Sequence, residues 1–239
     1  MTSTDNTNNT NNEIKQIHEV VAIIDRSGSM NGKEKDTIGG INSTFEVLKE
    51  EEDVNTITNI SIKLFDHEEI MLIRSTNLKN VKPLKDHDFV PRGQTALLDA
   101  IGNTLNYFMT RKLENENSYN ICSIYIVTDG YENASKNYTS KKIKRMINEA
   151  EENYNIKLLY LGANQDAILE ASKFGIDSAH ALNYSENSEN VDSAYRSVAS
   201  AMRRHSAGEN SSFTPAERQS SQPRSVEPPL LRRMSRMNR

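Results

Sequence analysis

The strongest constraint on the fold is a run of apolar residues that stops abruptly at an acidic turn. Residues 20–24 are Val-Val-Ala-Ile-Ile, and residues 25–29 are Asp-Arg-Ser-Gly-Ser. A short apolar run that ends at a polar turn is typical of a strand that is buried on both faces. Such strands occur in parallel sheets that are covered by helices on both sides. The run therefore predicts the centre of an α/β fold.

The turn after this strand places oxygen-bearing side chains at alternate positions. Asp25 offers a carboxylate, Ser27 and Ser29 offer hydroxyls, and Gly28 lets the backbone bend tightly. Oxygen donors at the carboxyl end of a buried strand suit a hard divalent cation such as Mg²⁺. Serine and aspartate are also frequent in turns that bind nothing, because their side chains satisfy turn backbone groups. The turn alone leaves both interpretations open.

Two later segments supply side chains of the same kind. Thr95 precedes a stretch with helical spacing of apolar residues, so it is either a helix N-cap or a ligand. A second apolar strand over 120–128 ends at Asp129. If the two apolar strands are parallel neighbours, Asp25 and Asp129 lie at the same edge of the sheet, where α/β proteins bind ligands. The spacing thus predicts one site built from three distant loops.

Together these three segments resemble the metal-ion-dependent adhesion site (MIDAS) of the von Willebrand factor A (vWA) domain family, and the resemblance covers about residues 17–203. It implies an octahedral Mg²⁺ or Mn²⁺ ion with one open coordination position, which a carboxylate of a partner protein fills. The domain would then be a metal-dependent protein-binding module. The ligands implied are the hydroxyls of Ser27, Ser29 and Thr95, which bind the ion directly, and the carboxylates of Asp25 and Asp129, which act mainly through water or as outer ligands.

Other residues on the same loops flank these ligands and are expected to contact the partner. They are Arg26, Gln94, Tyr131 and Glu132. Residues 128–135 and 161–166 are also similar to an intracellular single-domain subgroup of the family, which includes tellurite-resistance-type and phage-encoded proteins. This finer resemblance identifies neither a partner nor a pathway.

Apolar periodicity predicts alternating strands and helices along the chain. Expected strands lie at about 18–24, 57–64, 69–74, 120–128, 156–161 and 178–182, and expected helices at about 33–50, 94–111, 139–153, 163–174 and 191–203. Gly39-Gly40 is expected to bring the first helix close to the sheet. Asp66-His67-Glu68 predicts a hairpin with solvated turn residues, in preference to a metal or acid–base pair. The predicted class is α/β, doubly wound, with a mostly parallel central sheet, one antiparallel edge strand and helices on both faces.

Composition divides the chain into three parts. Residues 1–16 are rich in Asn, Thr and Ser and are predicted to be disordered, residues 17–204 form the domain, and residues 205–239 form a disordered tail rich in Arg, Ser and Pro. Two Arg-Arg-x-Ser stretches, ending at Ser206 and Ser235, resemble sites of basophilic kinases. The positive tail would suit an acidic partner, RNA or an anionic membrane, and a simple solvated tail is the alternative.

Composition also limits the class of protein. A net charge of −4 gives no direct sign of a nucleic-acid partner. Cys122 is the only cysteine, so an internal disulfide is excluded and a buried core position is expected. No apolar run approaches the ~20 residues of a membrane span, and no apolar signal region begins the chain. These features predict a cytoplasmic protein and leave its oligomeric state open.

The motifs argue against an enzyme. A phosphatase of the haloacid-dehalogenase type would need a second aspartate where this chain has Ser27. The sequence also contains neither a G-x-S-x-G elbow nor a G-x-x-x-x-G-K-[ST] loop. A protein without catalytic activity is therefore predicted. A metal-dependent hydrolase or phosphatase-like enzyme, and a structural domain with an idle metal site, are the alternatives.

Overall fold

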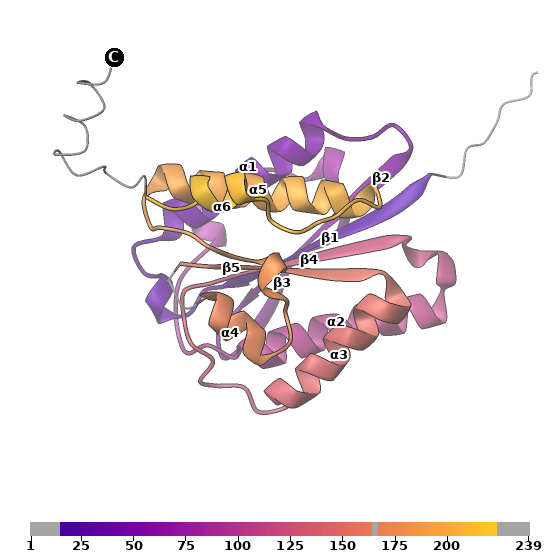
Figure 1. The fold of residues 1–239 in the computed structure, drawn as a ribbon. Coiled ribbons are helices and arrows are strands. Elements are labelled where there is room, and N and C mark those ends of the chain that lie inside the picture. Colours follow the sequence, from indigo (N-terminus) through magenta and orange to yellow (C-terminus); the bar gives the residue numbers. More distant parts are fainter. Residues whose placement is uncertain (1–14, 164–166, 224–239) are drawn as a thin grey trace, which may run out of the picture.

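The computed structural model describes residues 15–163 and 167–223, and its centre is a six-stranded sheet (Figure 1). The strand order is β3-β2-β1-β4-β5-β6. Every neighbouring pair is parallel except β2 and β3, which are antiparallel at one edge. The fold class predicted from the sequence is therefore confirmed. The strands are β1 (Gln16–Asp25), β2 (Thr56–Phe65), β3 (Glu69–Asn77), β4 (Ile121–Thr128), β5 (Ile156–Gly162) and β6 (Ala181–Asn183).

Helices cover both faces of this sheet (Figure 1). One layer contains α1 (Glu34–Glu50), α5 (Ser188–Ser206) and α6 (Pro215–Ser220), and the other contains α2 (Leu97–Glu114), α3 (Ser140–Tyr154) and α4 (Ala167–Lys173). Two hydrophobic cores lie between the layers and the sheet. Along β1, Val20, Ala22 and Ile24 belong to the α1–α5 core, whereas Val21 and Ile23 belong to the α2–α3 core. This alternation explains why residues 20–24 are apolar without a break.

A glycine allows α1 and α5 to pack closely. A Cβ atom at Gly40 would lie 2.2 Å from Cδ2 of Tyr195, a side chain on α5 that is 1% exposed. Gly39 faces open space. Gly39-Gly40 was expected to bring the first helix close to the sheet. This expectation is wrong, because Gly40 allows α1 to pack closely against helix α5 and not against a strand.

The chain beyond Arg204 differs from the prediction. Helix α5 continues to Ser206, and residues 207–223 fold back on the domain, where Phe213 is 4% exposed. Arg204 forms an ion pair with Glu217 of α6, with 2.9 Å between Nη1 and Oε1. Disorder was predicted from polar composition, and it is wrong for 205–223 because these polar side chains find partners within the fold. Residues 1–14 and 224–239, including the motif at Ser235, lie outside the described residues.

Smaller differences concern boundaries. Gln16 is the first residue of β1 and not part of a disordered segment, and α5 begins at Ser188, three residues before the predicted start. The predicted strand at 178–182 is a 3₁₀ turn, Ser178–His180, followed by β6. Cys122 is fully buried as expected.

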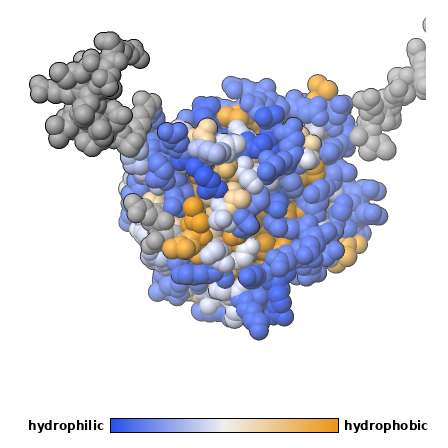
Figure 2. Space-filling view, viewed as in Figure 1, coloured by the Kyte–Doolittle hydropathy of each residue, from blue (hydrophilic) through white to orange (hydrophobic). Residues whose placement is uncertain are grey.

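The surface in Figure 2 is mostly hydrophilic, with apolar side chains gathered between the two helix layers. Within the described part of the chain, no helix has the length and apolar character needed to cross a membrane.

Candidate metal centre

The strand order brings the two predicted aspartates to one edge of the sheet. β1 and β4 are parallel neighbours with Ile24 opposite Val127, so Asp25, the next residue, and Asp129, two residues further on, lie at the same rim. The Asp25 side chain is fully buried, and its two oxygens accept hydrogen bonds from Ser27 N (2.7 Å to Oδ1) and Thr128 Oγ1 (2.6 Å to Oδ2). Burial raises the pKa of Asp25, and these hydrogen bonds oppose the increase. A buried carboxylate of this kind favours a nearby cation.

The turn after β1 holds the two serine hydroxyls beside Asp129. Ser27 Oγ and Ser29 Oγ lie 3.1 Å apart, and Ser29 Oγ donates to Asp129 Oδ1 at 2.6 Å. The turn continues as a 3₁₀ helix, Gly28–Met30, whose Met30 side chain is buried in the α1–α5 core. A fully buried anchor at the end of the turn fixes the positions of both hydroxyls.

Gly130 shows where the predicted ligand atoms converge. A Cβ atom built on Gly130 would lie 2.9 Å from Thr95 Oγ1, 3.3 Å from Ser29 Oγ and 3.4 Å from Asp25 Oδ2. Oxygens from the turn after β1 and from the loop before α2 therefore surround one point beside Gly130, on the loop after β4, and the lack of a side chain at position 130 leaves that point open. An oxygen-lined cradle of this kind fits a hard divalent cation.

Thr95 does not act as a helix cap. The N-cap of α2 is Ala96, which makes no side-chain capping bond, and the backbone N–H of Leu98 is instead bonded by Glu132 Oε2 at 2.9 Å. Thr95 is 3% exposed, and its hydroxyl points toward the cradle at Gly130. The N-cap alternative left open by the sequence is thus removed.

The loop after β4 positions Thr95. Asn133 Oδ1 accepts from Thr95 N, and Asn133 N donates to Thr95 O, both at 3.0 Å. One helical turn later, Asp99 accepts from the backbone N–H groups of residues 136–138 at 2.9–3.0 Å. Sequence analysis did not identify these loop-to-helix bonds, which join the Asp129 loop and the Thr95 loop into one unit.

Two of the four predicted partner contacts are used inside the protein. Besides Leu98 N, the Glu132 carboxylate accepts from backbone N–H groups of Ala134 (3.0 Å) and Ser135 (2.7 Å). Arg26 is 6% exposed, and its Nε lies 3.0 Å from Asp66 Oδ2. These two expectations are corrected, because neighbouring sequence position does not determine which way a side chain points. Gln94 is exposed, and Tyr131 is 53% exposed.

Asp66 is also not the solvated turn residue that was expected. Its side chain is fully buried and pairs with Arg26 and with Arg92, whose Nε donates to Oδ2 at 2.9 Å. Ligand atoms of Asp66, His67 and Glu68 lie within 4.8 Å of one another. The two arginines neutralise this group, so Asp66 stabilises the loop that precedes Thr95.

Lys33 is a charged residue of the site that sequence analysis missed. Its ammonium group forms ion pairs with Asp129 Oδ2 and with Glu186 Oε1, the latter at 2.6 Å. Burial alone would lower the pKa of Lys33, but hydrogen bonds to the two carboxylates outweigh burial and raise it. The partners are 96 and 153 residues away in sequence, so no local pattern indicated them.

The chain resembles solved vWA domains in fold. A von Willebrand factor type A structure from Catenulispora acidiphila aligns with a TM-score of 0.56 and 16% identity over 79% of this chain and 43% of that one. The vWF domain of the pilus tip protein Mfa5 from Porphyromonas gingivalis aligns with a TM-score of 0.55 and 14% identity over 80% and 96%. Proximal thread matrix protein 1 from the mussel byssus, in a form with a zinc-occupied MIDAS motif, gives 0.53 and 11% over 78% and 46%.

The fold is therefore that of a vWA domain, a Rossmann-like sheet with one antiparallel edge strand. The chain spans less than half the length of the Catenulispora and mussel structures. Neither a protein-family model nor a curated protein matches the sequence.

Proposed function

We propose that this protein binds a divalent cation at the edge of its sheet and uses the bound ion to capture a carboxylate of a partner protein. The observation that carries the proposal is the convergence of Thr95, Ser29 and Asp25 oxygens around one point beside Gly130. Mg²⁺ is the proposed ion and Mn²⁺ the alternative, since both prefer oxygen donors. The proposed ligands are Asp25, Ser27, Ser29, Thr95 and Asp129.

This set of ligands is better suited to binding a partner carboxylate through the ion than to holding the ion alone. Three of the five donors are uncharged hydroxyls, so the residues of this chain cancel only part of the charge of a divalent cation. Thr128 and Ser27 N orient the two oxygens of Asp25, and Ser29 orients Asp129. A bound cation would offer its remaining positive charge to an acidic side chain, and a charge pair at the centre of an interface contributes strongly to specificity.

The same residues give no reason to propose catalysis. The position that would hold an acid in a phosphatase is Ser27, whose hydroxyl lies beside Ser29. We therefore propose a binding module without activity of its own. Gln94 and Tyr131 are proposed as partner contacts, because both are exposed on loops that carry ligands. An intracellular location, as in the tellurite-resistance-type subgroup, is part of the proposal.

Metal-dependent stability is the first test. Ligand binding to the folded state raises stability by about 2.7 kcal/mol when the ligand is at 100 times its Kd. Thermal unfolding with EDTA and with Mg²⁺ or Mn²⁺ should show a metal-dependent rise that the Asp25→Ala/Ser27→Ala variant lacks. Asp86→Ala, at an exposed position away from the sheet edge, is the matched control and should keep the rise. A rise that persists in the double variant would refute the assignment.

Capture itself needs a second assay. An immobilised wild-type protein should retain an acidic peptide in Mg²⁺ and release it in EDTA, whereas the amide form of the same peptide should not bind. Retention by the Asp25→Ala/Ser27→Ala variant would instead support the alternative of a structural domain with an idle metal site.

A further inference from the structure

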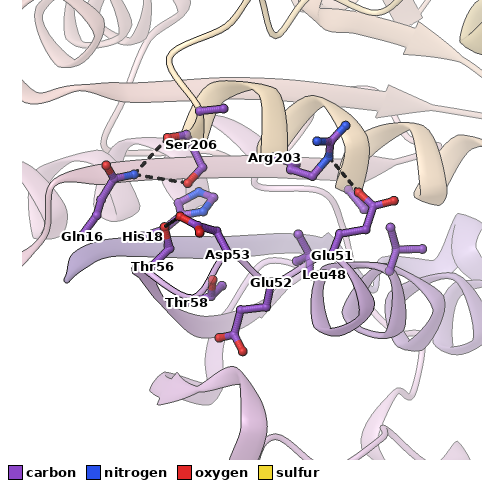
Figure 3. Close-up of a pocket in the computed structure, with 13 residues that line it drawn as sticks. Gln16, His18, Leu48, Glu51, Glu52, Asp53, Thr56, Thr58, Arg203 and Ser206 are labelled. Carbon is purple, nitrogen blue, oxygen red and sulfur yellow. Dashed lines mark hydrogen bonds and ion pairs between the residues drawn. The ribbon is translucent and has the colours of Figure 1, made fainter. Parts of the chain in front are cut away.

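A cavity lies at the opposite end of the sheet from the metal centre. It has a volume of about 230 Å³ and lies where α1 and α5 end beside the first residues of β1 and β2 (Figure 3). His18 and Thr58 line it from the strands, Glu51 from the end of α1, and Arg203 from α5. No ligand proposed for the metal centre lines this cavity.

A chain of hydrogen bonds runs from the cavity into the protein. His18 is 2% exposed, and its Nε2 lies 2.8 Å from Ser123 Oγ. Ser123 Oγ lies 2.9 Å from His205 Nδ1, and His205 Nε2 lies 3.3 Å from Asn155 Oδ1. The amide nitrogen of Asn155 donates to the carbonyl of Asn120 at 3.0 Å, so Oδ1 is the acceptor for His205. The direction of the last hydrogen bond in this series, from His205 Nε2–H to Asn155 Oδ1, is therefore fixed.

That direction determines the proton positions on both rings. Burial lowers the pKa of His205 to about 4 and that of His18 to about 3, so both rings are neutral at pH 7. His205 must donate from Nε2, so its Nδ1 accepts the Ser123 hydroxyl proton. Ser123 Oγ then accepts from His18 Nε2–H. His18 is left with an unprotonated Nδ1, which has no hydrogen-bond partner among the described residues.

Three carboxylates, those of Glu51, Glu52 and Asp53, line the cavity together with one guanidinium, that of Arg203. Residues 51–53 are Glu-Glu-Asp at the C-terminal end of α1, and α5 also ends at the cavity, so two helix ends add partial negative charge. Arg203 pairs with Glu51 at 2.7 Å, and Lys79 pairs with Glu52 at 3.1 Å. The Asp53 carboxylate accepts hydrogen bonds from the backbone N–H of Asn55 and the hydroxyl of Thr56, and it forms no ion pair with another described residue.

We propose that this cavity binds a small organic cation of the primary-amine class, whose ammonium group donates a hydrogen bond to His18 Nδ1. The Thr58 hydroxyl on the same wall is a second acceptor, and the Glu-Glu-Asp rim balances the charge. A divalent metal is not proposed here, because the described residues that line the cavity contain no group of three His, Cys, Asp or Glu ligand atoms close enough together to hold one. An anion would meet three carboxylates and one guanidinium, that of Arg203, which Glu51 already pairs with.

Binding of butane-1,4-diamine and butylamine to the full chain tests the proposal, with butan-1-ol and butyrate as neutral and anionic controls. Calorimetry should show binding of the amines alone, with equal affinity in EDTA and in Mg²⁺ because the cavity is remote from the metal centre. Nitrogen NMR should show His18 unprotonated at Nδ1, with a resonance that shifts on addition of either amine. Equal binding of the alcohol, no binding of the amines, or a protonated His18 Nδ1 would overturn the proposal.

A pair of charge variants separates the site from general surface charge. Glu51→Gln removes a lining carboxylate and frees Arg203, so it should weaken amine binding about tenfold. Glu50→Gln makes the same charge change one residue earlier, at an exposed position that does not line the cavity, and should leave the affinity within about twofold. Equal weakening by both variants would mean that the amine binds the acidic surface and not the cavity.

Discussion

The ammonium group of Lys33 pairs with the proposed ligand Asp129 and would therefore compete with a metal ion for its carboxylate. Its ammonium contacts Asp129 and Glu186 together, and 24% of its side chain is exposed. If a divalent ion binds through Asp129, the ammonium must give up part of this ion pair. Lys33→Met should therefore tighten metal binding, although it removes a residue of the site.

The magnitude follows from the contact. Two unit charges about 4 Å apart interact by about 4 kcal/mol at an effective dielectric constant of about 20. Partial exposure, and the second carboxylate that continues to hold Lys33, reduce the cost of breaking the Asp129 contact to about 1–2 kcal/mol. Metal affinity should rise about tenfold, which corresponds to about 1.4 kcal/mol.

The positive charge of Lys33 should stabilise the metal-free protein, although it weakens metal binding. Without Lys33, Asp129 loses its counter-ion beside buried Asp25, so the variant should unfold about 1–2 kcal/mol more easily in EDTA. For a domain of this size that is about 2–4 °C in Tm for each kcal/mol. Saturating Mg²⁺ should remove the difference, since the ion then neutralises Asp129 in both proteins.

Calorimetric titration with Mg²⁺ and unfolding with and without EDTA measure both effects. Lys35→Met is the control, because it makes the same substitution two residues later, at an exposed position in the first turn of α1. If Lys33→Met weakens metal binding, or if its loss of stability is the same in EDTA and in saturating Mg²⁺, then Lys33 orients Asp129 and does not compete with the ion.

Four further predictions test other parts of the structure. Gly130→Ala should abolish stabilisation by Mg²⁺ in a thermal shift assay, because its Cβ would lie 2.9 Å from Thr95 Oγ1; a retained shift would place the ion elsewhere. Glu132→Ala leaves the backbone N–H groups of Leu98, in the first turn of α2, and of Ser135, in the loop after β4, without their acceptor. Urea unfolding should therefore show a loss of about 1–3 kcal/mol and titration a weaker metal affinity, and an unchanged affinity would separate this loop from the site. Phe213→Ala should cost about 3 kcal/mol in the same urea experiment, whereas a disordered segment after residue 206 would show no change. The free energy of unfolding should fall as the pH decreases from about 6.5 toward 4. Histidines of the unfolded chain take up protons in this range, whereas His18 and His205 of the folded protein, with pKa values of about 3 and about 4, stay neutral. His205→Gln should make stability depend less on pH, and an unchanged slope would exclude His205 as a cause.

The fold could be predicted because its information is local. An unbroken apolar run at 20–24 marks a strand with a core on each side, and the two cores are indeed built from alternate residues of β1. Polar residues directly after such strands lie at one sheet edge by topology alone. The sequence therefore predicts that Asp25 and the residues after Val127 lie together, and the register of β1 and β4 agrees.

The polar pairings could not be predicted in the same way. Glu132 bonds to Leu98, and Lys33 to Asp129, across separations of 34 and 96 residues. Arg26 is next to Asp25 in sequence, yet its side chain is buried against Asp66. Apolar spacing determines which face of an element is buried, but it carries no information on which charged groups meet once the loops are closed.

The C-terminal segment shows why composition alone was misleading there. β6 is the edge strand of the described sheet and has one strand neighbour, β5, so backbone carbonyls at this edge need other donors. Arg218 donates to the carbonyls of Ser178, Ala179 and Ala181 at 2.9–3.0 Å, and Ser221 and Gln222 donate to that of Asn183 at 2.9 and 2.7 Å. Each such bond contributes about 1 kcal/mol or somewhat more where arginine is the donor. These hydrogen bonds hold the segment against the domain together with the buried Phe213 side chain, and a count of the segment's own apolar residues does not reveal them.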